Sequence, residues 1–210
     1  AQGLVLTLPV LFWQAPRPTQ GEFDVLLLDV GQGGGSLVRT DQHSLMYDAG
    51  PGARNGNDAG QRIILPVLRA LNETPSMLLL SHTDTDHAGG MRSLRTAFAQ
   101  VPWVGGAPQA HALVQAGMQP CHAGQQWQWD GVEFAFLHPV VGEAQRDDNG
   151  QSCVLRVRTG SQAMLLTGDI TAAEEAQLVQ QQPDLLRSQV LLAAHHGSRT
   201  SSSLAFLNTV

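Results

Sequence analysis

The chain has 210 residues, 42% of them hydrophobic, which is enough for one compact domain. Its formal net charge of −6 excludes a broadly basic nucleic-acid-binding surface. All 12 basic residues are arginine, which suits local bidentate contacts with phosphate. Cys121 and Cys153 are too few and too widely spaced to predict a disulfide scaffold or a zinc-thiolate site, and they leave the redox compartment open.

Residues 3–13 form an almost wholly apolar run that ends before Pro16 and Pro18. A transmembrane helix needs about twenty residues, so this run is too short to span a bilayer, and no basic region precedes it as in a signal peptide. Trp13 at the polar boundary suits a membrane-interface position. The run is therefore either the end of a membrane helix or a first buried strand.

Three strands are predicted next, over 23–30, 36–40 and 44–47, with a glycine-dense turn at 31–35. We expect them to form a β-meander. The glycines permit positive φ angles and a close approach of the backbone to a site. Asp48 follows the third strand directly.

A polar loop at 51–58 leads into a predicted helix at 61–71, with Pro66 in its first turn. Residues 77–80 are an apolar strand, and residues 88–97 have helical spacing. The segment between that strand and that helix is therefore a strand-to-helix turn.

Four ionisable side chains crowd on this turn, at His82, Asp84, Asp86 and His87. Carboxylates so close together repel one another unless a cation neutralises them. The alternative interpretation is a solvated polar turn. The clustering of carboxylates with imidazoles favours a metal site.

A strand at 101–104 and a helix at 109–117 follow. Trp127 and Trp129 then alternate with polar residues on one face of a strand. We expect both to lie in the core. A platform that stacks single-stranded bases is the alternative, because aromatic faces hold bases in this way.

A second β block comprises strands at 132–137 and 153–158. The first strand ends at His138. Cys153 shares an inward face with other apolar residues, so it is predicted to be a small buried residue without chemistry.

A buried strand at 163–167 presents Asp169 at its end. A helix is predicted at 171–181, with Thr171 as its cap and Glu174 completing a capping box. Asp169 is expected to be functional, and an ordinary turn aspartate is the alternative.

An apolar strand at 189–194 ends in His195 and His196, one β-α-β step after Asp169. A helix is predicted at 201–207. The intervening residues, which offer hydroxyls, a glycine and a guanidinium, are Gly197, Ser198, Arg199, Thr200 and Ser201. We predict that these residues, together with free N–H groups at the start of that helix, bind an anionic group such as phosphate. The alternative is a serine-rich helix cap.

The order of His82, Asp86 and His87 after a strand resembles the His-x-His-x-Asp-His motif of the metallo-β-lactamase superfamily. The sequence departs from that motif at Asp84, where the second histidine usually stands. Asp48, Asp169 and the His195-His196 pair are similar to other motifs of the superfamily in the same order.

The Asp84 variant, together with the segments 29–33 and 195–198, resembles the hydrolase domain of the ComEC family of DNA-uptake proteins over roughly 23–207. This likeness implies an α/β fold, an αββα four-layer sandwich with the motifs at one sheet edge. Family members continue with further strands, so the sandwich is expected to be incomplete after Val210. The division implied is 1–21, the end of a membrane helix with a linker, and 22–210, the hydrolase domain.

The resemblance also implies a pair of divalent cations bridged by Asp169. The ligands assigned to one cation are His82, Asp84 and Asp169, and those assigned to the other are Asp86, His87, Asp169 and His196. Asp86 and His195 are expected to serve catalysis, with His195 facing the phosphate or the leaving group. Because adjacent side chains of a strand point oppositely, the roles of His195 and His196 are also open to reversal.

Other residues of the motifs are expected to support these ligands. Asp48 is expected to orient a ligand. The third motif of the superfamily supplies a histidine, but here the candidates are Asp148, Asn149 and Ser152, with His138 a less favoured substitute. Asn149 and Ser152 are assigned to the surroundings of the cations. The site is therefore rich in oxygen donors, which favours Mn²⁺ over Zn²⁺.

Two cations suit phosphodiester hydrolysis, because they activate water and stabilise the charge that develops on phosphate oxygens. The resemblance implies a DNA nuclease beside the membrane channel of the same bacterial parent chain. Its expected role is to degrade the strand that is not imported during transformation, as a monomeric domain in the periplasm or outside the cell. The alternatives are a hydrolase of small phosphodiesters, esters or lactones, and a non-catalytic module that guides DNA.

Overall fold

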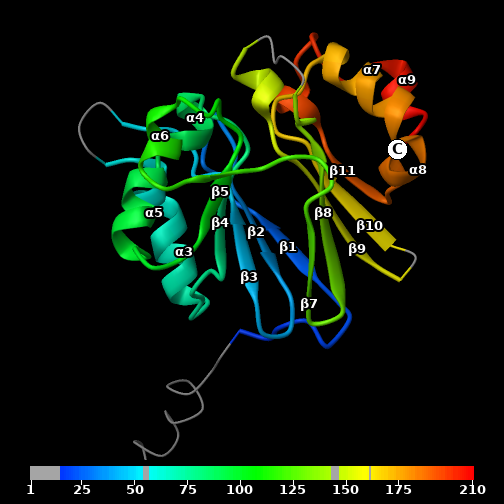
Figure 1. Cartoon of the computed structure of the whole chain (residues 1–210). Helices are drawn as coiled ribbons and strands as arrows, with labels where there is room; N and C mark the ends of the chain where they lie inside the picture. The colour runs from blue at the N-terminus through cyan, green and yellow to red at the C-terminus, as the bar shows by residue number, and fades with distance from the viewer. Residues whose placement is uncertain (1–14, 54–56, 143–146, 161) are drawn as a thin grey trace, which may run out of the picture.

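The computed structural model describes residues 15–53, 57–142, 147–160 and 162–210 (Figure 1). The predicted end of a membrane helix at 3–13 lies outside the described residues. No helix within the described ranges combines the length and the hydrophobicity needed to cross a membrane.

The first sheet has six strands in the order β1-β2-β3-β4-β5-β6. Its strands are β1 (Asp24–Leu27), β2 (Ser36–Arg39), β3 (Ser44–Tyr47), β4 (Met77–Leu80), β5 (Trp103–Gly105) and β6 (Gln119–Pro120). The first three are antiparallel, which confirms the predicted meander, and the pairs from β3 to β6 are parallel. Parallel strands require crossovers, and helices supply most of them on one face of the sheet.

The second sheet has five strands in the order β11-β10-β9-β8-β7. They are β7 (Gln126–Trp129), β8 (Val132–His138), β9 (Val154–Thr159), β10 (Gln162–Leu166) and β11 (Val190–Leu192). All neighbours are antiparallel except β10 and β11, which are joined through a helix.

Helices cover the outer face of each sheet (Figure 1). Those of the first half are η1 (Gly60–Ile64), α3 (Leu65–Ala70), α4 (Thr85–Ala88), α5 (Met91–Ala97) and α6 (Ala112–Gln115). Those of the second half are α7 (Ala172–Gln181), α8 (Pro183–Leu186) and α9 (Leu204–Leu207), and two short 3-10 turns are η2 (Asn149–Gln151) and η3 (Ala194–Gly197). The layers are helix, sheet, sheet and helix, as predicted.

Side-chain alternation along β4 explains the layering. Leu78 and Leu80 pack against the helices of the first half, whereas Leu79 packs between the sheets with Phe134 and Leu155 of the second sheet. Because successive side chains of a strand point to opposite faces, an apolar strand of this kind needs cover on both faces.

Two predicted helices are interrupted. The segment predicted as one helix at 61–71 is the π-turn η1 followed by α3, in which Pro66 lies in the first turn as expected. The segment at 88–97 is divided between α4, which begins earlier at Thr85, and α5. The capping box of Thr171 and Glu174 on α7 is confirmed.

Trp127 and Trp129 are half-buried and pack against the cluster between the sheets, and Trp127 stacks on Phe134 with ring centroids 5.1 Å apart. The core interpretation is therefore confirmed.

The prediction that Cys153 is a buried residue without chemistry is wrong about its chemistry. Cys121 and Cys153 are bonded, with Cα atoms 6.0 Å apart. Their sequence separation of 32 gives no local signal of a bond, but the segment after β6 lies against the start of β9 once the sheets pack together. Both cysteines are buried, so Cys153 is an inward residue as expected, but it also carries a covalent cross-link between the two sheets.

Candidate metal centre

The turn between β4 and α4 presents the central ligands. His82 lies at the end of β4 and is fully buried. Asp84 has extended backbone angles at the cap position of α4, but its side chain makes no capping hydrogen bond, so the carboxylate is free for another role. The single turn of α4 then carries Asp86 and His87.

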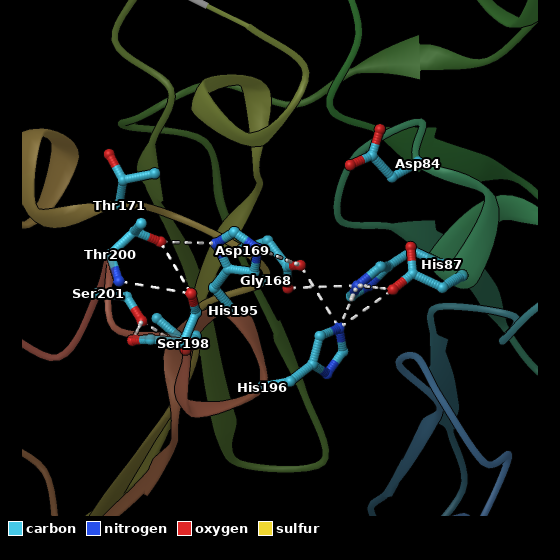
Figure 2. A network of polar contacts seen from close by, with 12 residues as sticks. Asp84, His87, Gly168, Asp169, Thr171, His195, His196, Ser198, Thr200 and Ser201 are labelled. Atoms are coloured by element: carbon cyan, nitrogen blue, oxygen red, sulfur yellow. Dashed lines mark hydrogen bonds and ion pairs between the residues drawn. The ribbon is translucent and has the colours of Figure 1, made fainter.

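Four candidate ligands from both halves of the sandwich converge above the sheets. Asp86, His87, Asp169 and His196 offer ligand atoms that all lie within 4.8 Å of one another. His196 Nε2 is 3.4 Å from Asp169 Oδ2 and 3.0 Å from His87 Nε2. Figure 2 shows how these side chains point toward one another. These are the four residues assigned to one cation from the sequence.

Asp48 holds His87 from behind. It is buried, has a φ angle of 63°, and accepts a hydrogen bond from His87 Nδ1 at 2.8 Å. This bond directs His87 Nε2 toward the other three groups. Burial lowers the pKa of His87, but the charges of Asp48 and Asp169 outweigh burial and raise it to about 10. The structure therefore places Asp48 where an orienting residue is expected.

Ser81 fixes the tautomer of His82. The Ser81 hydroxyl donates its proton to Asp48 Oδ2 at 2.9 Å, so it accepts from His82 Nδ1 at 2.9 Å. His82 Nε2 is then an unprotonated nitrogen, buried and without a hydrogen-bond partner among the described residues. Burial and the charge of His87 lower the pKa of His82, which favours this neutral form.

Asp84 is the nearest carboxylate to that nitrogen. Its Oδ2 lies 3.5 Å from His82 Nε2, and its side chain is exposed. Figure 2 shows Asp84 apart from the group formed by His87, Asp169 and His196. The structure thus brings His82 and Asp84 together, but it does not place them in the same cluster as the other four ligands.

Asp169 occupies the buried position between the halves. Gly168, with a φ angle of 56°, turns the chain after β10, and a Cβ there would lie 2.8 Å from the Cβ of Ser81. The Asp169 N–H donates to Ser152 Oγ at 3.1 Å. Burial raises the pKa of Asp169, but the hydrogen bond and charge of His87 outweigh it and lower the pKa. Asp169 is therefore an anion held against two imidazoles.

The sequence interpretation placed His195 and His196 on a strand with their side chains on opposite faces, but the two residues lie beyond the strand. Strand β11 ends at Leu192, and both histidines adopt left-handed backbone angles, with φ of 51° and 53°. His196 Nε2 lies 3.4 Å from Asp169, whereas His195 Nε2 lies 3.9 Å away. His195 Nδ1 contacts the Thr200 hydroxyl at 3.3 Å (Figure 2). The distances favour His196 as the ligand.

The loop before β9 supplies Asn149 and Ser152. Asn149 Oδ1 is buried without a hydrogen-bond partner among the described residues, and Ser152 contacts Asp169 as given above. His138 Nε2 donates to the Gly150 carbonyl at 2.9 Å. That bond directs His138 away from a role as the missing histidine.

The predicted phosphate site at Gly197–Ser201 needs correction in one respect. The helix begins at Leu204 with Ser203 as its cap, not at Ser201. The N–H groups of Ser202 and Ser203 donate to the buried Glu175 carboxylate at 2.5 and 2.8 Å, so they are not free for a substrate. The hydroxyls of Ser198 and Thr200 contact each other, and Ser201 donates to Ala194 O.

Sequence reasoning missed three supporting features. Ser81, Glu175 and the close approach of Gly34 were not assigned. A Cβ at Gly34 would lie 2.7 Å from Asp48 Oδ2 and 2.8 Å from His87 Nδ1, so the glycine turn fits directly against the site. The run of glycines was the available signal, and the hydroxyl before His82 was another.

The donor set fits divalent cations. Two imidazole nitrogens and two carboxylates face one another, and the buried His82 Nε2 has an unused lone pair beside Asp84. Carboxylates at such distances repel unless positive charge lies between them. The raised pKa of His87 keeps its imidazole protonated, and the positive charge of that ring offsets part of this repulsion.

The family described as "Metallo-beta-lactamase superfamily" matches residues 28–209. The chain is 44% identical to competence protein ComA of Neisseria gonorrhoeae, over 91% of the chain and 26% of that protein. It is 36% identical to recombination protein 2 of Haemophilus influenzae, over 96% of the chain and 24% of that protein. The chain spans about a quarter of the length of these curated relatives.

Solved structures show the same fold at lower identity. A metallo-beta-lactamase of Cronobacter sakazakii is 16% identical with a TM-score of 0.62, and the match covers 92% of this chain and 90% of that one. The MIM-2 metallo-beta-lactamase is 15% identical with a TM-score of 0.59, over 93% and 86% of the two chains.

Proposed function

The chain belongs to the metallo-beta-lactamase superfamily, and we propose that it is the DNA-hydrolysing domain of a membrane DNA-uptake protein. The observation that carries this proposal is the cluster of Asp86, His87, Asp169 and His196, which joins both sheets at an accessible edge. The names of the relatives, a competence protein and a recombination protein, support DNA as the substrate.

Two groups of residues would hold the cations. Asp86, His87, Asp169 and His196 would bind one, and His82 and Asp84 would bind the other, with Asp169 shared. Bound divalent cations lower the pKa of water and offset negative charge on phosphate oxygens.

Residues that bind no cation support the ligands and the substrate. Asp48 keeps Nδ1 of His87 protonated, so that Nε2 stays a donor atom for the site. Ser152 and Gly168 hold Asp169 between the halves. His195 Nε2 faces the same space and is placed to protonate or hold the leaving oxygen of the cleaved phosphodiester.

We propose Mn²⁺ as the preferred cation and Zn²⁺ as the alternative. Asp84 stands where a zinc-binding member would supply a histidine, and the loop before β9 offers Asn149 and Ser152 in place of another. Carboxylate and amide oxygens suit Mn²⁺, whereas a larger number of imidazoles suits Zn²⁺.

The bond between Cys121 and Cys153 supports a periplasmic or extracellular location for the domain. Structural disulfides persist in oxidising compartments and are rare in the cytosol of most organisms. A catalytic domain on that side of the membrane would meet incoming DNA before or during its transport by the membrane portion of the parent chain.

The test is cleavage of end-labelled single- and double-stranded DNA by the purified domain with added Mn²⁺, with Asp169→Ala as the inactive control. We expect the unmutated domain to cut DNA and the Asp169→Ala variant to leave it intact. Cleavage of bis(p-nitrophenyl) phosphate without cleavage of DNA would favour a hydrolase of small phosphodiesters. DNA binding without any hydrolysis would favour the guiding module.

A further inference from the structure

A hollow of about 750 Å³, with a lining of mixed polar and apolar groups, lies on the outer side of the first sheet. Its walls come from η1 and α3 on one side and from α5 on the other. In Figure 1 these helices lie together on the face of the first sheet that points away from the second sheet. The proposed catalytic residues do not line this hollow.

The hollow begins directly behind the metal centre. Gly89, which lines it, follows the ligand His87 by two residues. The Gly52 N–H, from the opposite wall, donates to Thr85 O at 3.3 Å. A Cβ at Gly89 would lie 1.8 Å from Gly52 N, so the two backbones are in contact. The wall between hollow and centre is therefore the single turn of α4, which is about 6 Å long.

Two arginines give this hollow its charge. Arg69 of α3 and Arg92 of α5 are exposed, and neither guanidinium group makes an ion pair or hydrogen bond with another described residue. By contrast, Arg39 and Arg158 are paired with acidic side chains. Free guanidinium groups facing one hollow are notable in a chain with a net charge of −6.

The acidic group of the hollow is already engaged. Asp58 Oδ1 accepts from the Gln61 N–H at 2.9 Å, and Oδ2 accepts from the Ser93 hydroxyl at 2.7 Å. These bonds join η1 to α5 and hold the two walls at a fixed separation. The carboxylate therefore braces the hollow, and it leaves the two guanidinium groups without an acidic partner.

We propose that this hollow binds the sugar-phosphate backbone of DNA to one side of the phosphate that is cleaved. The inference rests on the proposed nuclease function and adds a path for the strand. Guanidinium groups form paired hydrogen bonds with phosphate. No aromatic side chain lines the hollow, so it would hold backbone without stacking bases, and binding would be independent of sequence.

An anionic membrane surface is a weaker fit to the same charges. Binding of a protein surface to a membrane draws on exposed apolar side chains as well as on basic ones. The large apolar side chains that are exposed among the described residues all lie outside η1, α3 and α5. A concave surface with two guanidinium groups instead suits a chain of phosphates.

The experiment compares two double variants of the full chain that change the net charge equally. Arg69→Ala/Arg92→Ala removes the proposed contacts. Arg158→Ala/Arg187→Ala removes two exposed arginines from β9 and the end of α8 in the second half. The readout is anisotropy of labelled single-stranded DNA in Ca²⁺ across a salt series, with a gel to confirm that the DNA is intact.

We expect the first double variant to bind more weakly and to lose about 1.4 from the slope of log K against log salt, because each phosphate contact contributes about 0.7. Arg158→Ala/Arg187→Ala should bind DNA with the affinity and the salt slope of the unmutated chain. Unchanged affinity and slope in Arg69→Ala/Arg92→Ala would overturn the proposal, as would equal losses in both variants. Loss of binding to phosphatidylserine vesicles with unchanged DNA binding would assign the hollow to a membrane instead.

Failure of the nuclease function is recognised separately. If the unmutated chain binds DNA but never cuts it, the proposed nuclease function is refuted. The comparison of DNA binding by the two double variants would still decide the role of the hollow. If the unmutated chain cuts DNA, Arg69→Ala/Arg92→Ala should raise the KM for long DNA. Hydrolysis of bis(p-nitrophenyl) phosphate should be unchanged, because that substrate is too short to reach past α4.

Discussion

The candidate metal centre has a buried half and an exposed half. The side chains of His82, His87 and Asp169 are 0%, 3% and 5% exposed, whereas those of Asp84 and His196 are 45% and 30% exposed. The buried groups are held by hydrogen bonds in which Asp48 accepts from His87, Ser81 accepts from His82, and Ser152 accepts from the Asp169 N–H. The exposed groups depend on turn backbone for their positions. The buried half can therefore be organised before a cation binds, and the exposed half can adapt to the cation and the substrate.

The largest effect is expected at the shared buried carboxylate. Asp169→Ala should reduce DNA cleavage by about 10³-fold or more, because cations contribute several kcal/mol of transition-state stabilisation and each 1.4 kcal/mol equals tenfold in rate. Single-turnover cleavage with Mn²⁺ measures the loss, and elemental analysis measures bound metal. A variant with full metal content and near-normal cleavage would show that Asp169 is not the bridge.

A smaller loss is expected when the support of the buried half is removed. Asp48→Ala should reduce activity by about 10 to 100-fold, because His87 loses the partner that fixes its orientation. The same cleavage assay measures this change, and thermal unfolding of the variant tests whether the fold survives. Equal activity and equal metal binding in Asp48→Ala and Asp169→Ala would contradict the division of roles.

The sequence predicted most of the buried half. The spacing of His82, Asp86 and His87 after an apolar strand located the turn, and Asp169 was located by its own strand end. Local pattern is sufficient here, because each candidate ligand lies on a turn or short helix that follows an apolar strand. The order of layers followed from the same strands.

What local pattern could not show were pairings made by the packing of distant segments. The bond between Cys121 and Cys153 depends on how the two sheets meet. The Glu175 carboxylate accepts hydrogen bonds from the N–H groups of Ser202 and Ser203, which are 27 and 28 residues away in the sequence. The left-handed turn at His195 and His196 ends β11 earlier than predicted, and the His195 N–H donates to Gly168 O from the end of the neighbouring strand. Each is a long-range effect without a local signature.

The exposed half should determine which cation works best. With the natural sequence, Mn²⁺ should support faster DNA cleavage than Zn²⁺ by several-fold, because Asp84 supplies a carboxylate where zinc-binding members supply an imidazole. Asp84→His adds an imidazole beside His82 and should move the preference toward Zn²⁺. Rates of metal-free protein reconstituted with each cation measure the preference. Highest activity with Zn²⁺ and negligible activity with Mn²⁺ in the natural sequence would refute the assignment.

The smallest effect is expected at Arg199, which is exposed beyond the histidine pair. The N–H groups that were expected to assist it are taken by Glu175, so its own guanidinium carries the proposed phosphate contact. Arg199→Ala should therefore weaken DNA binding in Ca²⁺ by a few-fold and reduce the salt slope by about 0.7, one contact on a single strand.

The matched control for Arg199→Ala is Arg187→Ala, an exposed arginine after α8 whose loss changes the net charge equally. Metal content should be unchanged in both variants, because neither side chain is among the ligands. If Arg199→Ala binds DNA with the affinity and salt slope of Arg187→Ala, the phosphate does not contact this turn. The exposed half would then contribute ligands alone, and strand binding would depend on contacts elsewhere on the domain.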